Sequence, residues 1–139
     1  ADGSTIYFTS DRGGRPQIYQ VPSSGGAATR VTFQGNYNAT ATISPDGKKI
    51  AVAQGSGNTY RIALMDSSLG APRWSTISTG SLDESPSFAP NGSMLIYAAR
   101  EGGRGVLYAV SADARVRQRL VLADGDVREP AWSPYRSAR

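Results

Sequence analysis

The sequence of 139 residues contains no cysteine and no histidine. Without cysteine the chain forms no disulfide and offers no thiolate nucleophile or metal ligand. Without histidine it lacks the commonest general base and the commonest metal ligand, so a serine–histidine triad within the chain is excluded. All its apolar stretches are too short to cross a bilayer, and we expect no direct membrane insertion. We therefore predict no catalytic residues, no metal site and no cofactor.

The charge balance is mildly basic, with 15 Lys and Arg against 11 Asp and Glu and a net charge of +4. The basic residues are scattered, which is typical of an ordinary solvated surface and does not favour a nucleic-acid partner. The exception is segment 115–119, where arginine alternates with Val116 and Gln118. Alternation on a strand places the three arginines on one face, which we interpret as a solvated outer strand.

A short motif with a central Asp-Gly or Asn-Gly pair occurs three times, at steps of 44 and 45 residues. Such pairs close tight β-hairpins because their backbone accepts positive φ, and we assign Asp46 and Asn91 this structural role. A short apolar segment precedes the second and third copies, and another follows every copy. A fixed period near 44 with several strands per unit is typical of β-propeller blades. The motif occupies 1–4, 45–48 and 90–93.

Frequent turn signals and the absence of a helical period predict an all-β chain of four antiparallel strands per blade. We name the strands a to d, from the innermost to the outermost. The twelve expected strands are 5–10, 17–21, 29–33, 39–44, 50–54, 60–66, 74–78, 86–89, 94–99, 106–111, 116–122 and 130–133.

The repeats run 1–44, 45–89 and 90–133, followed by a tail at 134–139, and each is ordered b, c, d and then a. The first blade therefore lacks its inner strand, and 130–133 is an inner strand without a blade. Three blades are too few to close a ring, because propellers typically have four to eight. Either the chain is cut from a longer one, or two chains close a six-bladed ring through 130–133 with isologous twofold symmetry.

Four segments, 6–19, 44–48, 82–92 and 129–135, resemble the TolB family of the Tol–Pal system. The resemblance implies a periplasmic protein of a Gram-negative bacterium with a small α/β domain before a six-bladed propeller. This chain would supply the last three blades. The family's role in envelope integrity, cell division and protein transport, with the Pal lipoprotein and other Tol proteins as partners, is implied in the same way.

The resemblance further implies that Pal binds at a mouth of the central channel. In blade geometry the d–a loops lead into the innermost strands, and the b–c loops share their face. Candidate partner-binding residues are Tyr37, Asn38, Leu82, Asp83, Glu84, Val127, Arg128 and Glu129 in d–a loops, and Arg12, Arg15, Arg100 and Arg104 in b–c loops.

Each of these candidates also has a structural interpretation. Tyr37 and Leu82 could pack between blades, and the carboxylates of Asp83 and Glu84 could serve a local turn. Three residues at one repeat position of strand a are expected in the core between blades: Ile43, Phe88 and Trp132.

The leading functional hypothesis is a non-enzymatic, protein-binding propeller. The alternative is the propeller gate of a prolyl-oligopeptidase-type serine peptidase, whose nucleophile and histidine would lie in a downstream hydrolase domain.

Overall fold

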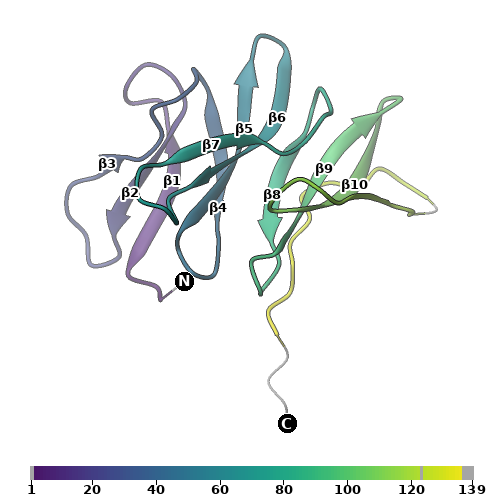
Figure 1. The fold of residues 1–139 in the computed structure, drawn as a ribbon. Coiled ribbons are helices and arrows are strands. Elements are labelled where there is room, and N and C mark those ends of the chain that lie inside the picture. The colour runs from purple at the N-terminus through teal and green to yellow at the C-terminus, as the bar shows by residue number, and fades with distance from the viewer. Residues whose placement is uncertain (1, 123, 136–139) are drawn as a thin grey trace.

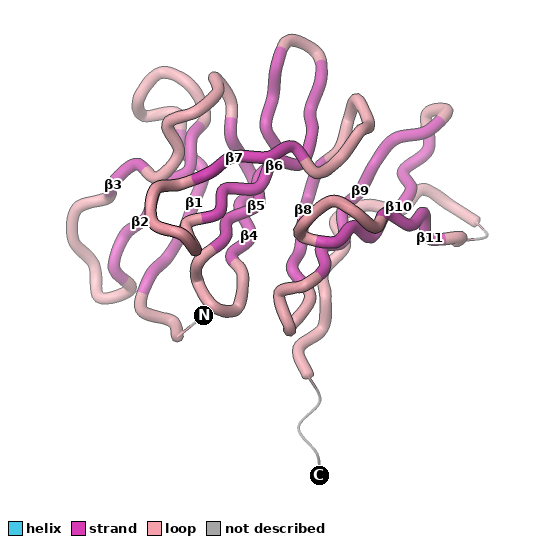
Figure 2. Tube along the Cα trace, in the orientation of Figure 1, coloured by secondary structure: helices cyan, strands magenta, loops and turns pink. Residues whose placement is uncertain are grey.

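A computed structural model describes residues 2–122 and 124–135. These residues form eleven strands in three antiparallel sheets, and the described ranges contain no helix (Figures 1 and 2). Consecutive strands are neighbours in every sheet, as in the blades of a propeller. The all-β, partial-propeller architecture predicted from the repeats is confirmed.

The first sheet contains β1 (Thr5–Ser10), β2 (Gln17–Pro22) and β3 (Thr29–Arg30). The second contains β4 (Asn38–Ile43), β5 (Lys49–Ser56), β6 (Thr59–Asp66) and β7 (Arg73–Thr76). The third contains β8 (Glu84–Phe88), β9 (Met94–Glu101), β10 (Arg104–Ser111) and β11 (Arg117–Leu120).

The predicted strand at 130–133 is not formed, which corrects the expected number of strands. A strand requires a ladder partner, and within the described residues this segment has no strand b beside it. It instead runs close to the third sheet, where the Trp132 N–H donates to the Ser87 hydroxyl at 3.0 Å. As predicted, the first sheet lacks an inner strand.

All three outer strands end earlier than the sequence suggested, and in the first two a side chain replaces the backbone ladder. The Ile18 N–H donates to the Thr32 hydroxyl at 2.9 Å, and the Ile62 N–H donates to the Ser78 hydroxyl at 2.8 Å. A hydroxyl acceptor satisfies the buried N–H as a strand carbonyl would, so regular pairing can stop there.

Hairpin turns between strands a and b repeat one geometry. Gly47 and Gly92 have φ of 73° and 72°, which confirms that these turns require left-handed backbone. The Asp46 carboxylate accepts from the Ser44 hydroxyl at 2.6 Å and from the Lys48 N–H at 3.0 Å. These two bonds, the Ser44 one foremost, hold the pKa of Asp46 below its ordinary value. The Asp-Gly pair thus has the structural role assigned to it.

The hydrophobic core lies between adjacent sheets, because alternate residues of a strand face opposite neighbours. Ile50 and Val52 of β5 pack with Ile18 of the first sheet, whereas Ala51 packs toward the third. The outermost faces lack a neighbouring sheet among the described residues. Phe88, which packs in the core between the second and third sheets, is 7% exposed, whereas Trp132 at the same repeat position is 41% exposed. The expectation that Trp132 is a core residue is wrong for this chain.

Candidate protein-binding face

The loops between strands d and a are tied to the b–c ends of the preceding sheets. The same backbone hydrogen bond recurs at each of the three junctions. The N–H of the residue that leads into strand a donates to the carbonyl of the residue at the start of strand c in the preceding blade. These bonds run from Asn38 to Pro16 at 2.9 Å, from Asp83 to Tyr60 at 2.9 Å, and from Val127 to Gly105 at 3.2 Å. The d–a and b–c loops therefore share one face, at the end of the sheets that carries the β5–β6 hairpin (Figure 1).

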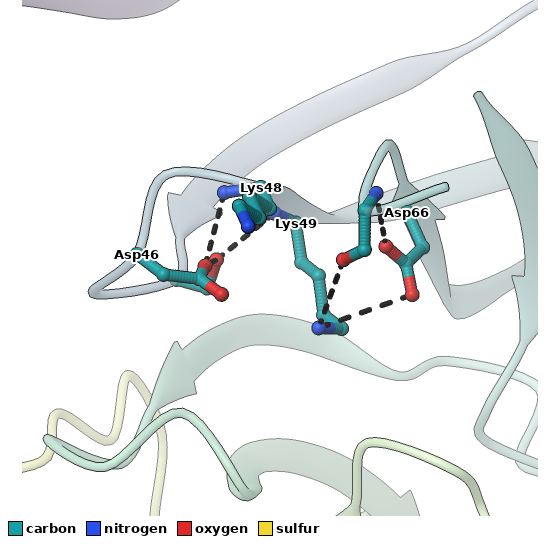
Figure 3. A network of polar contacts seen from close by, with 6 residues as sticks. Asp46, Lys48, Lys49 and Asp66 are labelled. Atoms are coloured by element: carbon teal, nitrogen blue, oxygen red, sulfur yellow. Dashed lines mark hydrogen bonds and ion pairs between the residues drawn. The ribbon is translucent and has the colours of Figure 1, made fainter. Parts of the chain in front are cut away.

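The opposite face carries the a–b and c–d turns. Lys49 joins these turns in the second sheet: its ammonium lies 3.9 Å from the Asp66 carboxylate and donates to the Ser68 hydroxyl at 3.4 Å (Figure 3). Half-exposed contacts of this kind contribute little stability. Substitutions on this face can therefore serve as matched controls for substitutions on the face that carries the d–a and b–c loops.

Asn38 is fully buried and holds its loop in place. Its side-chain amide donates to Gln17 Oε1 and to the Gln34 carbonyl, both at 2.8 Å. Its side-chain carbonyl accepts from Gln54 Nε2 at 3.0 Å. The side chain of Asn38 is therefore satisfied internally and has a structural role in this loop.

Asp83, at the next repeat of the same position, is also fully buried. Its Oδ2 accepts from the Gly80 N–H at 2.8 Å, while Oδ1 has no hydrogen-bond partner among the described residues. Burial raises the pKa of Asp83, against the opposing effects of the Ser78 hydroxyl, the Gly80 N–H, and Arg117 and Arg61. Its carboxyl group belongs to the junction between two blades.

Tyr97 and Arg117 complete this junction. Burial, assisted by the negative charge of Asp83, raises the pKa of the Tyr97 phenol to about 12. Arg117 Nη2 donates to the Ile77 carbonyl at 2.8 Å, linking the third sheet to the second. Arg115, Arg117 and Arg119 are all exposed, as the alternation at 115–119 predicts, and the middle arginine also links two blades.

Other predicted residues remain accessible around a small apolar pocket. The Tyr37 and Tyr60 rings meet edge to face at 5.2 Å, and Tyr60 forms a backbone bridge with Leu82. Leu82 is 41% exposed. Together with Glu84 and Arg100, these residues line a pocket of about 220 Å³ between the second and third sheets. Tyr60 is not among the residues predicted from the sequence. The signal that could have identified it is its repeat position, which is the same as that of Pro16 and Gly105, the residues beside the other two d–a loops.

Inner strands bend at this face through a recurring left-handed residue. Thr40 and Ser85 have φ of 53° and 54° where the register of β4 and β8 shifts. Glu129 has φ of 51° at the same repeat position. The segment 129–132 therefore retains the bend of an inner strand although it has no sheet of its own.

Several predicted arginines are held by local contacts. Arg12 stacks over the rings of Phe8 and Tyr19, at 5.0 and 4.9 Å from their centroids. Arg104 donates to the Gly125 carbonyl at 2.8 Å. Arg128 forms an ion pair with Asp126 at 2.6 Å. Arg15 remains exposed and has no ion pair within the described ranges.

Within the part of the chain that the structure describes, no three His, Cys, Asp or Glu residues cluster as metal ligands would. Among the same residues, no helix has the length and apolarity needed to cross a membrane.

Three meander sheets, one of three strands and two of four, with inner strands bent at one shared face, define this chain as part of a β-propeller. It belongs to the TolB beta propeller domain family, whose profile matches residues 1–136. It is 85% identical over 119 residues to the Tol-Pal system protein TolB of Xanthomonas campestris pv. campestris, covering 86% of this chain and 27% of that protein. The chain thus spans about a quarter of that curated relative.

A solved structure agrees with this assignment. The crystal structure of TolB from Acinetobacter baumannii matches with a TM-score of 0.86 and 50% identity, over 96% of this chain and 33% of that one. The three sheets are therefore arranged as part of a TolB propeller.

Proposed function

We propose that this chain contributes partner-binding loops to a non-enzymatic propeller of the Tol–Pal system, in the periplasm of a Gram-negative bacterium. The proposed partner is the Pal lipoprotein, bound at the mouth of the central channel, with other Tol proteins acting in the same envelope-maintenance process. Membership of the TolB propeller family supports this proposal and disfavours the peptidase-gate alternative. The high identity to the Tol-Pal system protein TolB of Xanthomonas campestris supports the assignment to the Tol–Pal system.

The observation that carries this proposal is the pocket of about 220 Å³ beside the inner strands. Its apolar wall includes Tyr37, Tyr60 and the half-exposed Leu82, while Glu84 and Arg100 supply opposite charges at its edge. An apolar centre with a charged rim is the usual composition of a protein–protein contact. We propose that a side chain of Pal fills this pocket.

Titration of purified Pal into the chain tests this proposal. Leu82→Ala should weaken binding about tenfold, since a central apolar contact typically contributes about 1–2 kcal/mol. Leu69→Ala is the matched control because Leu69 is 78% exposed in a c–d turn on the opposite face. Binding that is absent, or that Leu82→Ala and Leu69→Ala weaken equally, would overturn the proposal.

We also propose that two copies can close a six-bladed ring. The first sheet lacks its inner strand, and Glu129 already has the bend that Thr40 and Ser85 show in paired inner strands. Residues 130–133 of one copy would then pair with β1 of the other, covering Trp132. Light scattering should give twice the 14.7 kDa chain mass, and Trp132→Ser should restore the single mass. A monomer with intact β-sheet signal contradicts this assembly.

A further inference from the structure

A polar groove of about 680 Å³ runs between the first and second sheets on the same face as the d–a loops. Arg15, from the loop before β2, and Arg61, from β6, both line it, together with Asn36, Ser56 and Thr59. The residues that line this groove include no aspartate and no glutamate. Its electrostatic character is therefore cationic, with neutral hydrogen-bonding groups around the charges.

The two arginines are available to a ligand. Both are exposed, and neither has an ion pair among the described residues. Arg61 Nε donates to the Gly80 carbonyl at 3.0 Å, which orients the guanidinium while its terminal nitrogens make no hydrogen bond within the described ranges. By contrast, Arg119 and Arg128, elsewhere in the molecule, each contact a carboxylate. A positioned guanidinium with free terminal nitrogens is suited to bidentate binding of a carboxylate.

The groove shares a wall with the apolar pocket of the proposed Pal site. Tyr37 and Tyr60 line both cavities, and their edge-to-face packing at 5.2 Å separates the cationic groove from the pocket beside Leu82. Gly55 permits this arrangement, since a methyl group there would lie 2.9 Å from the Tyr60 ring and 3.1 Å from Tyr37. An extended segment crossing the tyrosine pair would place one side chain in each cavity.

We infer that the groove binds an acidic segment of the partner protein, with glutamate or aspartate carboxylates on Arg15 and Arg61 and an adjacent aliphatic side chain in the pocket. The inference rests on the proposed protein-binding function and adds the chemistry of the segment that is recognised. Charge complementarity supports it, because the groove has two unpaired arginines and no acidic lining residue.

The probe is the peptide Gly-Ser-Glu-Leu-Glu-Ser-Gly, titrated into the isotope-labelled chain and followed by NMR. The amide signals of residues 54–61 should shift, and the same peptide with glutamine in place of glutamate should bind about tenfold more weakly, as expected for loss of a charge-assisted pair. Arg15→Gln/Arg61→Gln should cause a loss of similar size. Arg15→Gln alone should cause part of this loss of affinity and should leave the hydrogen bond between Arg61 and Gly80 intact.

The matched control is Lys48→Gln/Arg73→Gln, which removes the same charge from the face with the a–b and c–d turns. This control should retain the affinity for the glutamate peptide. Equal binding of the glutamine peptide, or equal weakening by the control variant, would overturn the inference. Pal binding that depends on Leu82 but not on the two arginines would also overturn it while leaving the proposed function intact. Binding of the peptide without binding of Pal would overturn the proposed function, while the groove would still be shown to bind acidic segments.

Discussion

The backbone N–H of Asp83 donates to the carbonyl oxygen of Tyr60 at 2.9 Å, and this bond ties the start of β8 to the preceding sheet. The same residue carries a buried carboxyl group with one unpartnered oxygen among the described residues. Its backbone therefore joins two blades, while ionisation of its side chain opposes their packing. Asn38 makes the equivalent backbone bond with a fully satisfied side chain.

Asp83→Asn should stabilise the chain at neutral pH. Because burial raises the pKa of Asp83, the native free energy of unfolding is highest below the ordinary value of 3.8 and falls as pH rises through the raised value. The amide introduced by Asp83→Asn does not ionise, so the free energy of unfolding of the variant does not decrease in this pH range. The variant should exceed the native chain by about 1–3 kcal/mol at about pH 7.5, because the amide removes the buried negative charge, with a smaller difference in acid. Urea unfolding across pH measures this change.

Asp46→Asn is the control for that titration and should have the opposite sign. The Ser44 hydroxyl and the Lys48 N–H lower the pKa of Asp46, so its stabilising effect is present above 3.8 and disappears as pH falls through the lowered value. The variant should be less stable than the native chain at neutral pH and should approach it in acid. The same sign for both variants would contradict the contrast between buried and exposed carboxylates.

Gly80→Ala should destabilise the junction by about 1–3 kcal/mol through overpacking. A methyl group at Gly80 would overlap Asp83 Oδ1. Because the obstacle is that side chain, Gly80→Ala/Asp83→Ala should cost less than the sum of the single substitutions in a double-mutant cycle. Additive costs, measured by urea unfolding, would argue against the contact.

Asn38→Asp should destabilise the first junction at neutral pH by about 1–3 kcal/mol, because it removes an amide donor and buries a carboxylate. Gln17 Oε1 and the Gln34 carbonyl would then face the new oxygen instead of an N–H group. The loss should diminish in acid, where the carboxyl is protonated. Thermal unfolding compared with the exposed control Asn36→Asp checks this prediction, and equal losses would contradict it.

Arg117→Gln should cost about 1–2 kcal/mol because it removes a charged hydrogen bond to Ile77 between two sheets. Arg115→Gln is the natural comparison, since Arg115 pairs only with Asp113 at 3.8 Å and its side chain is 86% exposed. Its cost should stay below about 0.5 kcal/mol. Denaturant midpoints of the two variants measure the difference, and equal midpoints would show that Arg117 is also only a surface residue.

Local sequence was sufficient to predict the blades. The Asp-Gly and Asn-Gly turns constrain the backbone within a few residues, so Gly47 and Gly92 could be placed without knowledge of distant contacts. The site was less predictable. Tyr60 lies about twenty residues from Leu82 in sequence, and only the folded d–a loop brings them together. No local pattern could distinguish the buried Asp83 from the exposed Glu84 beside it.

The sequence alone determined the all-β class, the period of the blades, their phase and the missing inner strand, because turn chemistry and strand alternation act over short distances. Only the tertiary structure decided which loop residues are buried and which arginines are paired. It also showed that 130–133 remains unpaired in a single chain. These outcomes depend on contacts between sheets, whose partners lie tens of residues apart and leave no signature in the local pattern.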